Sequence, residues 1–126
     1  MNTEELIYIE MSELDYQLIL HVKELRRNKF TQQELSLKMG MTKSFVGNVE
    51  QFLHSKKYNI RHLTLIAKAF GYKSISKLFD FPTPEHDWVR LTLRITPALK
   101  KDGTPSKEKK VEVIKVEPVK KGEGEK

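Results

Sequence analysis

The sequence predicts a mainly α-helical fold: five helices in one small domain, followed by a β-rich C-terminal extension. Between residues 13 and 80, apolar residues recur every three or four positions, which is the spacing of one helix face. Capping residues and glycines stand at the ends of these stretches. After Pro82 and Pro84 the pattern changes to an alternation of apolar and polar residues, which is typical of a half-buried strand.

We divide the chain into an N-terminal arm or strand at 1–12, a helical domain at 13–80, a β-hairpin at 81–119 and a disordered tail at 120–126. The segment LIYIEM at 6–11 is ambiguous, because it can form a strand or an early turn of the following helix. The extended form is favoured, because Ser12 resembles a helix N-cap with Glu13 and Asp15 in the first turn.

The hairpin is expected from two stretches with strand character. Residues 87–96 place Val89, Leu91, Leu93 and Ile95 on one face, and KKVEVIKVEPV at 109–119 is the second strand candidate. A lone two-stranded hairpin is marginal in water. We therefore expect it to pair with LIYIEM, either of its own chain or of a second subunit.

Three predicted helices contribute apolar faces to one core. The first spans about 13–27, the fourth follows the cap Asn59 and ends at Gly71, and a short last turn follows Ser74. Their core residues are expected to be Leu14, Leu18, Val22 and Leu25, then Ile60, Leu63, Ile66, Ala67 and Phe70, and finally Ile75, Leu78 and Phe79.

The chain is organised around two short helices between Thr31 and Gln51. Thr31 can cap the first helix while Glu34 bonds back to the N–H of the cap, an arrangement known as a capping box. Gly40 supplies the left-handed backbone that ends a helix, and Thr42 is expected to cap the second helix almost at once. Two helices joined so closely must cross steeply.

The second of these helices, predicted at 42–51, has two different sides. Val46 and Val49 point inward, because they lie three residues apart on one face. The outward residues are Lys43, Ser44, Gly47 and Asn48. This polar and cationic side is the one that we expect to touch base edges in a DNA major groove.

The net charge of +6 is unevenly distributed. Residues 1–20 carry −5, residues 21–61 carry +6, residues 62–97 carry +2 and residues 98–126 carry +3. The positive excess is concentrated around the predicted helix pair, as a phosphate-facing surface requires, although a solubilising surface has the same composition.

Several functional classes are not expected from the composition. The chain has no cysteine, and its four histidines show no metal-ligand spacing, so we expect neither a metal nor a cofactor. The sequence has no apolar run long enough to cross a bilayer and no basic start of a signal peptide, so we expect no membrane partner and a cytoplasmic location. We predict no enzyme, because neither a Gly-rich phosphate loop nor a nucleophile with an evident base is found.

With the helices placed in this way, residues 22–79 resemble the helix-turn-helix domain of the phage-repressor, Cro and xenobiotic-response-element (XRE) family of bacterial transcriptional regulators. The resemblance covers about half of the chain and implies a lambda-repressor-type fold. It is carried by Thr31-Gln32, Glu34-Leu35, Gly40, Thr42, Val46, Val49, Glu50, Leu63, Ile66-Ala67 and Gly71.

The resemblance also implies roles for single residues. Lys43, Ser44 and Asn48 match the base-reading positions of the family, and Phe45 either contacts a thymine methyl or packs on the domain. Gln32 would hold a DNA phosphate through its side chain and nearby backbone N–H groups.

Three further assignments accompany these. Thr31 and Thr42, at the two helix starts, are assigned to phosphate contacts as well. Glu50 would form a structural ion pair with an arginine of the first helix. That arginine is Arg26 or, because the link to the second helix looks one residue short, Arg27.

The chain departs from the family pattern after Glu50. Gln51-Phe52 and Tyr58 stand where an Asn-Gly pair and a proline are common, with about two additional residues between them. This longer loop carries His54, Ser55, Lys56 and Lys57, which either contact the phosphate backbone or are merely solvated. Gly47 replaces a side chain that often reads bases, so direct readout is expected to be sparse.

Together these features predict a sequence-specific regulator that binds double-stranded DNA. We expect a homodimer on a palindromic site with half-sites about one helical turn apart. Two alternatives stay open: an antitoxin-type DNA-binding protein whose C-terminal strands bind a toxin, and a module that binds protein or RNA.

Overall fold

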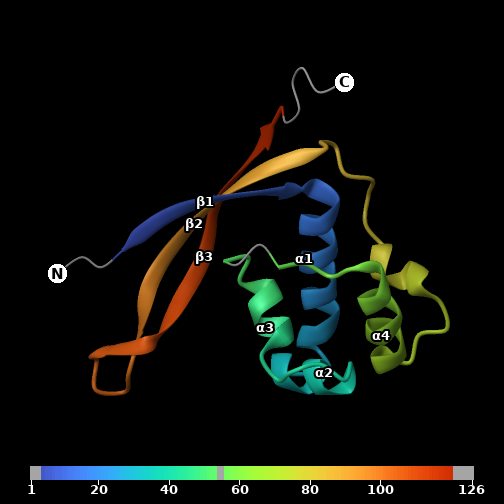
Figure 1. Cartoon of the computed structure of the whole chain (residues 1–126), viewed down its shortest axis with the longest axis horizontal. Coiled ribbons are helices and arrows are strands. Elements are labelled where there is room, and N and C mark those ends of the chain that lie inside the picture. Colours follow the sequence, from blue (N-terminus) through green and yellow to red (C-terminus); the bar gives the residue numbers. More distant parts are fainter. Residues whose placement is uncertain (1–3, 54–55, 121–126) are drawn as a thin grey trace.

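The computed structural model describes residues 4–53 and 56–120, with the backbone alone at 105–108. Within these ranges the elements in chain order are β1 (Glu5–Ser12), α1 (Glu13–Arg27), α2 (Gln32–Lys38), α3 (Phe45–Glu50), α4 (Ile60–Phe70), the 3-10 helix η1 (Ile75–Phe79), β2 (Trp88–Leu99) and β3 (Pro105–Val119). Figure 1 shows β1 running directly into α1, with the sheet on one side of the helices.

The prediction of a mainly α fold is wrong, because the chain forms an α+β fold. The described residues form a three-stranded antiparallel sheet in the order β1-β2-β3, and they form four α-helices rather than five. β1 pairs with β2 of its own chain from Glu5 opposite Ile95 to Ser12 opposite Trp88. The short N-terminal segment therefore becomes an edge of the sheet and joins the hairpin to the helices.

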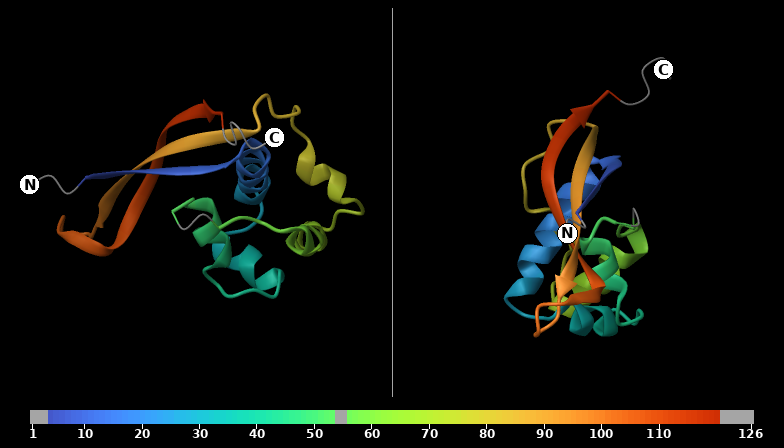
Figure 2. Two further views of the ribbon diagram at one scale, coloured as in Figure 1. Left: turned by 45° about the horizontal axis from the view of Figure 1, so that its top comes forward. Right: turned by 90° about the vertical axis from the view of Figure 1, so that its left-hand side faces the viewer.

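The sheet and the helices share one hydrophobic core. Val89, Leu91 and Leu93 of β2 are buried together with Leu18 and Val22 of α1, in a cluster that also includes residues of β1, α2, α3 and α4. Because side chains alternate along a strand, this inward face of β2 follows the predicted pattern. Figure 2 shows the turn between β2 and β3 projecting away from α1.

Helix starts agree with the sequence except at α3. Ser12 caps α1, and Thr31 and Glu34 form the predicted capping box of α2. However, α3 begins at Phe45 rather than at Thr42, and its N-cap Ser44 makes no side-chain capping bond. The prediction that Thr42 caps this helix is therefore wrong.

The missing cap of α3 is supplied by α2. The hydroxyl of Ser36 accepts a hydrogen bond from the N–H of Val46 at 2.9 Å and donates one to the carbonyl of Gln32 at 2.8 Å. Ser36 itself is fully buried. This bond joins residues of two different helices, so the local capping pattern of α3 does not reveal it.

Three residues assigned to the core are exposed instead. Leu14, Ile60 and Ile75 expose 48%, 85% and 45% of their surface. Each stands at the first or second position of its helix. Helical spacing gives the direction of a side chain and not the extent of the surface that covers it.

None of the helices in the described ranges has the length and hydrophobicity that a bilayer crossing requires. Apart from Lys120, the tail predicted to be disordered lies outside the described residues, as do His54 and Ser55 of the predicted loop.

Candidate nucleic-acid interface

A buried ion pair fixes α3 to α1. The guanidinium of Arg26 donates to the two carboxylate oxygens of Glu50, from Nε at 2.8 Å and from Nη2 at 2.9 Å. The two side chains expose only 10% and 2% of their surface. Arg27 was the alternative partner considered from the sequence. It forms a surface ion pair with Glu24 instead, with 3.7 Å between Nη1 of Arg27 and Oε2 of Glu24. The geometry therefore pairs Glu50 with Arg26.

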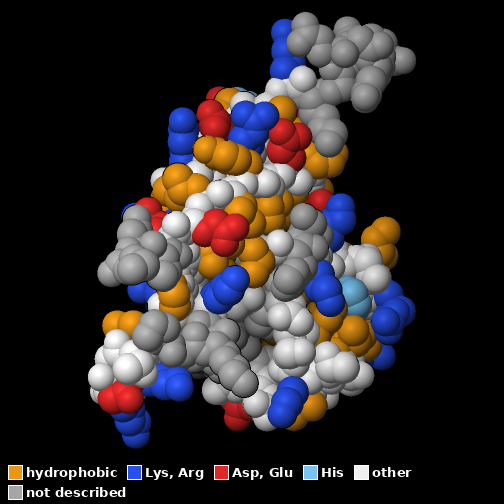
Figure 3. All heavy atoms as spheres, turned by 60° about the vertical axis from the view of Figure 1, so that its left-hand side comes forward, with side chains coloured by type: hydrophobic (Ala, Val, Ile, Leu, Met, Phe, Trp, Pro, Cys, Tyr) orange, Lys and Arg blue, Asp and Glu red, His pale blue; other side chains and the backbone are white. Residues whose placement is uncertain are grey.

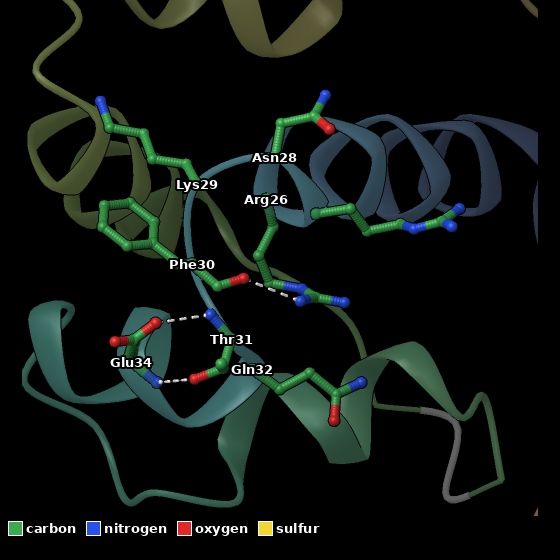
Figure 4. Close-up of a pocket in the computed structure, with 8 residues that line it drawn as sticks. Arg26, Asn28, Lys29, Phe30, Thr31, Gln32 and Glu34 are labelled. Carbon is green, nitrogen blue, oxygen red and sulfur yellow. Dashed lines mark hydrogen bonds between the residues drawn. The ribbon is translucent and has the colours of Figure 1, made fainter.

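The same arginine also holds the start of α2. Its Nη1 donates to the carbonyl of Phe30 at 3.0 Å, immediately before the capping box of Thr31 and Glu34. Figure 4 shows this bond and the two capping bonds, with Gln32 extending from the same segment. One buried side chain thus sets the relative positions of α1, α2 and α3.

Gln32 is part of this network. Its Nε2 donates to Oε1 of Glu50 at 2.8 Å, so the amide that was predicted to bind a phosphate is bonded within the protein. A Cβ atom at position 47 would lie 3.1 Å from Oε1 of Gln32. Gly47, which was predicted to lie against DNA bases, therefore also has an internal role, because it leaves room for Gln32.

The remaining polar residues of the predicted DNA-binding side are uncovered. Lys43 and Ser44 are exposed and Asn48 is half-buried, whereas Val46 and Val49 on the opposite side are completely buried. Across the described ranges, the side chains of Lys43, Ser44 and Asn48 have no hydrogen-bond or ion-pair partner. Their donors and acceptors are free to bind another molecule.

This side of α3 opens on a hollow of about 500 Å³. Its lining consists of Gln32 and Gln33 of α2, Lys43, Ser44, Gly47, Asn48 and Gln51, and Lys109 of β3. The predicted surface is therefore flanked by the hairpin without being buried by it. Figure 3 shows the molecule with the hairpin side turned forward, and Lys and Arg side chains are spread over this face.

Phe45 packs on the protein rather than standing free. Its ring centroid lies 4.7 Å from that of His62 and 6.1 Å from that of Tyr58. Burial, together with the charge of Arg61, lowers the pKa of His62, whose Nδ1 accepts the N–H of Asn59. The structure thus contains the packing contact that the sequence left as one of two roles for Phe45, and this contact joins α3 to α4.

Tyr58 closes the same aromatic cluster. Its side chain is buried, and within the described part of the chain its hydroxyl has no hydrogen-bond partner. Burial is the main cause that raises the pKa of Tyr58, and the negative charge of Glu50 adds to it. The hydroxyl is therefore a neutral group beside the buried ion pair.

The residues assigned to phosphate contacts are not gathered around the hollow. The hydroxyl of Thr31 accepts the N–H of Glu34, and Thr42 lies in the exposed turn before α3. Lys57 forms an ion pair with Asp15 of α1, with 3.5 Å between Nζ and Oδ2, and Lys56 is exposed. Of the assigned set, only Gln32 lines the hollow.

Sequence reasoning missed three residues of this surface: Gln33, Gln51 and Lys109. The two glutamines follow the periodicity of the helix pair and could have been found from it. Lys109 could not, because its place depends on how β3 lies relative to α3. The described residues contain no group of His, Cys, Asp and Glu side chains that could hold a metal ion.

Comparison of the chain with protein-family models, with curated proteins and with solved structures found no match. The site is therefore defined by its own geometry: two short crossing helices, a buried ion pair beneath them and an uncovered polar side on the second helix.

Proposed function

We propose that the protein is a sequence-specific regulator of transcription that binds double-stranded DNA with α3 in the major groove. The observation that carries this proposal is the contrast between the two sides of α3. Val46, Val49 and Glu50 hold one side of α3 in the core, whereas Asn48 on the other side faces an open hollow, together with Lys43 in the turn just before the helix. A rigidly held helix with unsatisfied polar groups is suited to reading base edges.

The chemistry of the uncovered side matches the donors and acceptors of the major groove. Lys43 can donate to O6 and N7 of guanine, and the amide of Asn48 can bond to N6 and N7 of adenine. The amides of Gln33 and Gln51 line the same hollow and can form the same type of bond. Gly47 contributes no side chain, so discrimination rests on these few groups.

The charge distribution supports binding to phosphate. Residues 21–61 carry a net charge of +6 and include α2, α3 and the segments around them. Neutralisation of DNA phosphates releases counterions, so the affinity falls as the salt concentration rises. The basic residues supply affinity in this proposal, and the side of α3 supplies specificity.

The proposal includes a homodimer on a palindromic site. Within the described sheet, β1 and β3 are the edges, and an edge strand carries unpaired backbone groups. Leu6 and Tyr8 of β1 expose 48% and 65% of their surface.

The same exposed residues favour a second candidate function, in which the sheet binds a different protein, such as the toxin partner of an antitoxin-type regulator.

Selection of bound duplexes from a random DNA pool tests the main proposal. We expect enrichment of one sequence. On that sequence, Lys43→Ala and Asn48→Ala should each lose about 1–3 kcal/mol of binding free energy, with little change on random DNA. Lys68→Ala in α4 is the matched control, because it removes an exposed lysine that does not line the hollow. Absence of enrichment, or equal losses on both kinds of DNA, would contradict the proposal.

A further inference from the structure

The end of the β2–β3 hairpin lies beside α3 on the side proposed to face DNA. Lys109 of β3 lines the same hollow as Lys43 and Asn48, although it stands more than sixty residues later in the chain. In Figure 1 the hairpin descends on the same side of the molecule as α3, and in the left view of Figure 2 its turn projects sideways, away from the helices. A molecule that binds in this hollow therefore contacts α3 on one side and β3 on the other.

The hairpin end is basic. Residues 100–110 contain five lysines and two acidic residues. One of the acids, Asp102, accepts hydrogen bonds from the N–H and the hydroxyl of Thr104 and so stabilises the turn. Lys109 is exposed and, among the described residues, has no ion-pair partner. Its charge is available to an anionic partner.

The sheet fixes the direction of Lys109. Val111 and Val113, on the same side of β3, pack against the core, so Lys109 points to the helices as well. Lys110, the next residue, points to the opposite face because side chains alternate along a strand. Arg94 of β2 donates to Glu112 at 2.7 Å and ties the two strands together close to this point. The ammonium group is therefore presented by a supported strand rather than by a free loop.

A helix in the major groove lies between two phosphate backbones, because the groove is only about 12 Å wide. An element that runs beside such a helix meets one of these backbones. We infer that the hairpin end is a second DNA-contacting element, in which Lys109 binds the sugar-phosphate backbone that borders the groove occupied by α3. This inference rests on the proposed function and extends it to a part of the chain outside the helix pair.

The test compares Lys109→Gln with Lys110→Gln. Both variants remove one exposed lysine from the same strand, but only Lys109 faces the hollow. The probe is a pool of random-sequence DNA duplexes, and dissociation constants are measured over a range of salt concentrations. The logarithm of the association constant falls linearly with the logarithm of the salt concentration. Loss of one phosphate contact makes this line less steep by about 0.9 per bound chain, which corresponds to about eightfold weaker binding at 0.1 M salt.

We expect this change for Lys109→Gln and a clearly smaller one for Lys110→Gln, with unchanged thermal unfolding for both. Equal effects of the two variants would overturn the inference and leave the proposed function intact. Tighter binding by Lys109→Gln would also overturn it, because the hairpin would then act as a cover over α3. If the unmodified protein binds no DNA at any salt concentration, the proposed function and this inference both fail.

Discussion

The structure predicts that the effect of alanine at position 47 depends on Gln32. Gly47 lies in α3 with a helical backbone, so alanine fits its dihedral angles. Its new Cβ would lie 3.1 Å from Oε1 of Gln32, which is closer than an ordinary contact. Gln32 cannot withdraw freely, because its Nε2 is bonded to the buried carboxylate of Glu50.

Two opposing contributions set the change in the free energy of unfolding that Gly47→Ala causes. Alanine in place of glycine inside a helix stabilises by about 1 kcal/mol. A hydrogen bond to a charged acceptor contributes about 1.5–3 kcal/mol, and we take the lower end because Gln32 is exposed. Gly47→Ala in the unmodified protein should therefore destabilise by about 0.5 kcal/mol. In the Gln32→Ala background it should stabilise by about 1 kcal/mol.

Urea unfolding of the unmodified protein, the two single variants and the double variant gives these values as a double-mutant cycle. The expected coupling energy is about 1.5 kcal/mol, with a change of sign between the backgrounds. If Gly47→Ala stabilises the protein equally in both backgrounds, Gln32 moves aside without losing its bond. The internal role that we assign to Gly47 would then be refuted.

Two further predictions concern the buried groups beneath α3. Glu50→Ala should cost about 3–5 kcal/mol in urea unfolding, because it leaves the buried guanidinium of Arg26 uncompensated. Glu24→Ala breaks only a surface pair and should cost less than about 1 kcal/mol; similar losses for both would contradict this reasoning. Tyr58→Phe should be neutral or stabilising at pH 7, because it removes a buried hydroxyl that has no partner within the described ranges. The folded state raises the pKa of Tyr58, so the unmodified protein should lose stability as the pH rises above about 10. Tyr58→Phe should lose less stability over the same range. Unfolding measured over an alkaline pH series would check this difference.

Local features of the helix pair were predictable from the sequence. The capping box of Thr31 and Glu34, the left-handed turn at Gly40 and the burial of Val46 and Val49 are all present. Each depends on residues within a few positions of one another, so spacing and side-chain chemistry are sufficient to identify them. The uncovered polar side of α3 was predictable for the same reason.

Several contacts between distant segments were not predictable. The hydroxyl of Ser36 caps α3 from α2, and Gln32 bonds inward to Glu50 rather than remaining free. The choice between Arg26 and Arg27 was also left open, because the link between the first two helices looked one residue short. These outcomes depend on how the helices cross, which no local pattern specifies.

The sequence by itself determined most of the helices and the two strands of the hairpin, together with the side of each that faces inward, because both follow from short-range periodicity and capping. The sequence also led us to expect that the hairpin pairs with the N-terminal segment, but only the tertiary structure decided that this pairing is made within one chain. The resulting three-stranded sheet changed the fold class from mainly α to α+β. The tertiary structure also decided that Lys109 stands opposite α3. The physical reason is that strand pairing and the placement of the hairpin depend on contacts between segments up to ninety residues apart, and such contacts leave no mark on local sequence spacing.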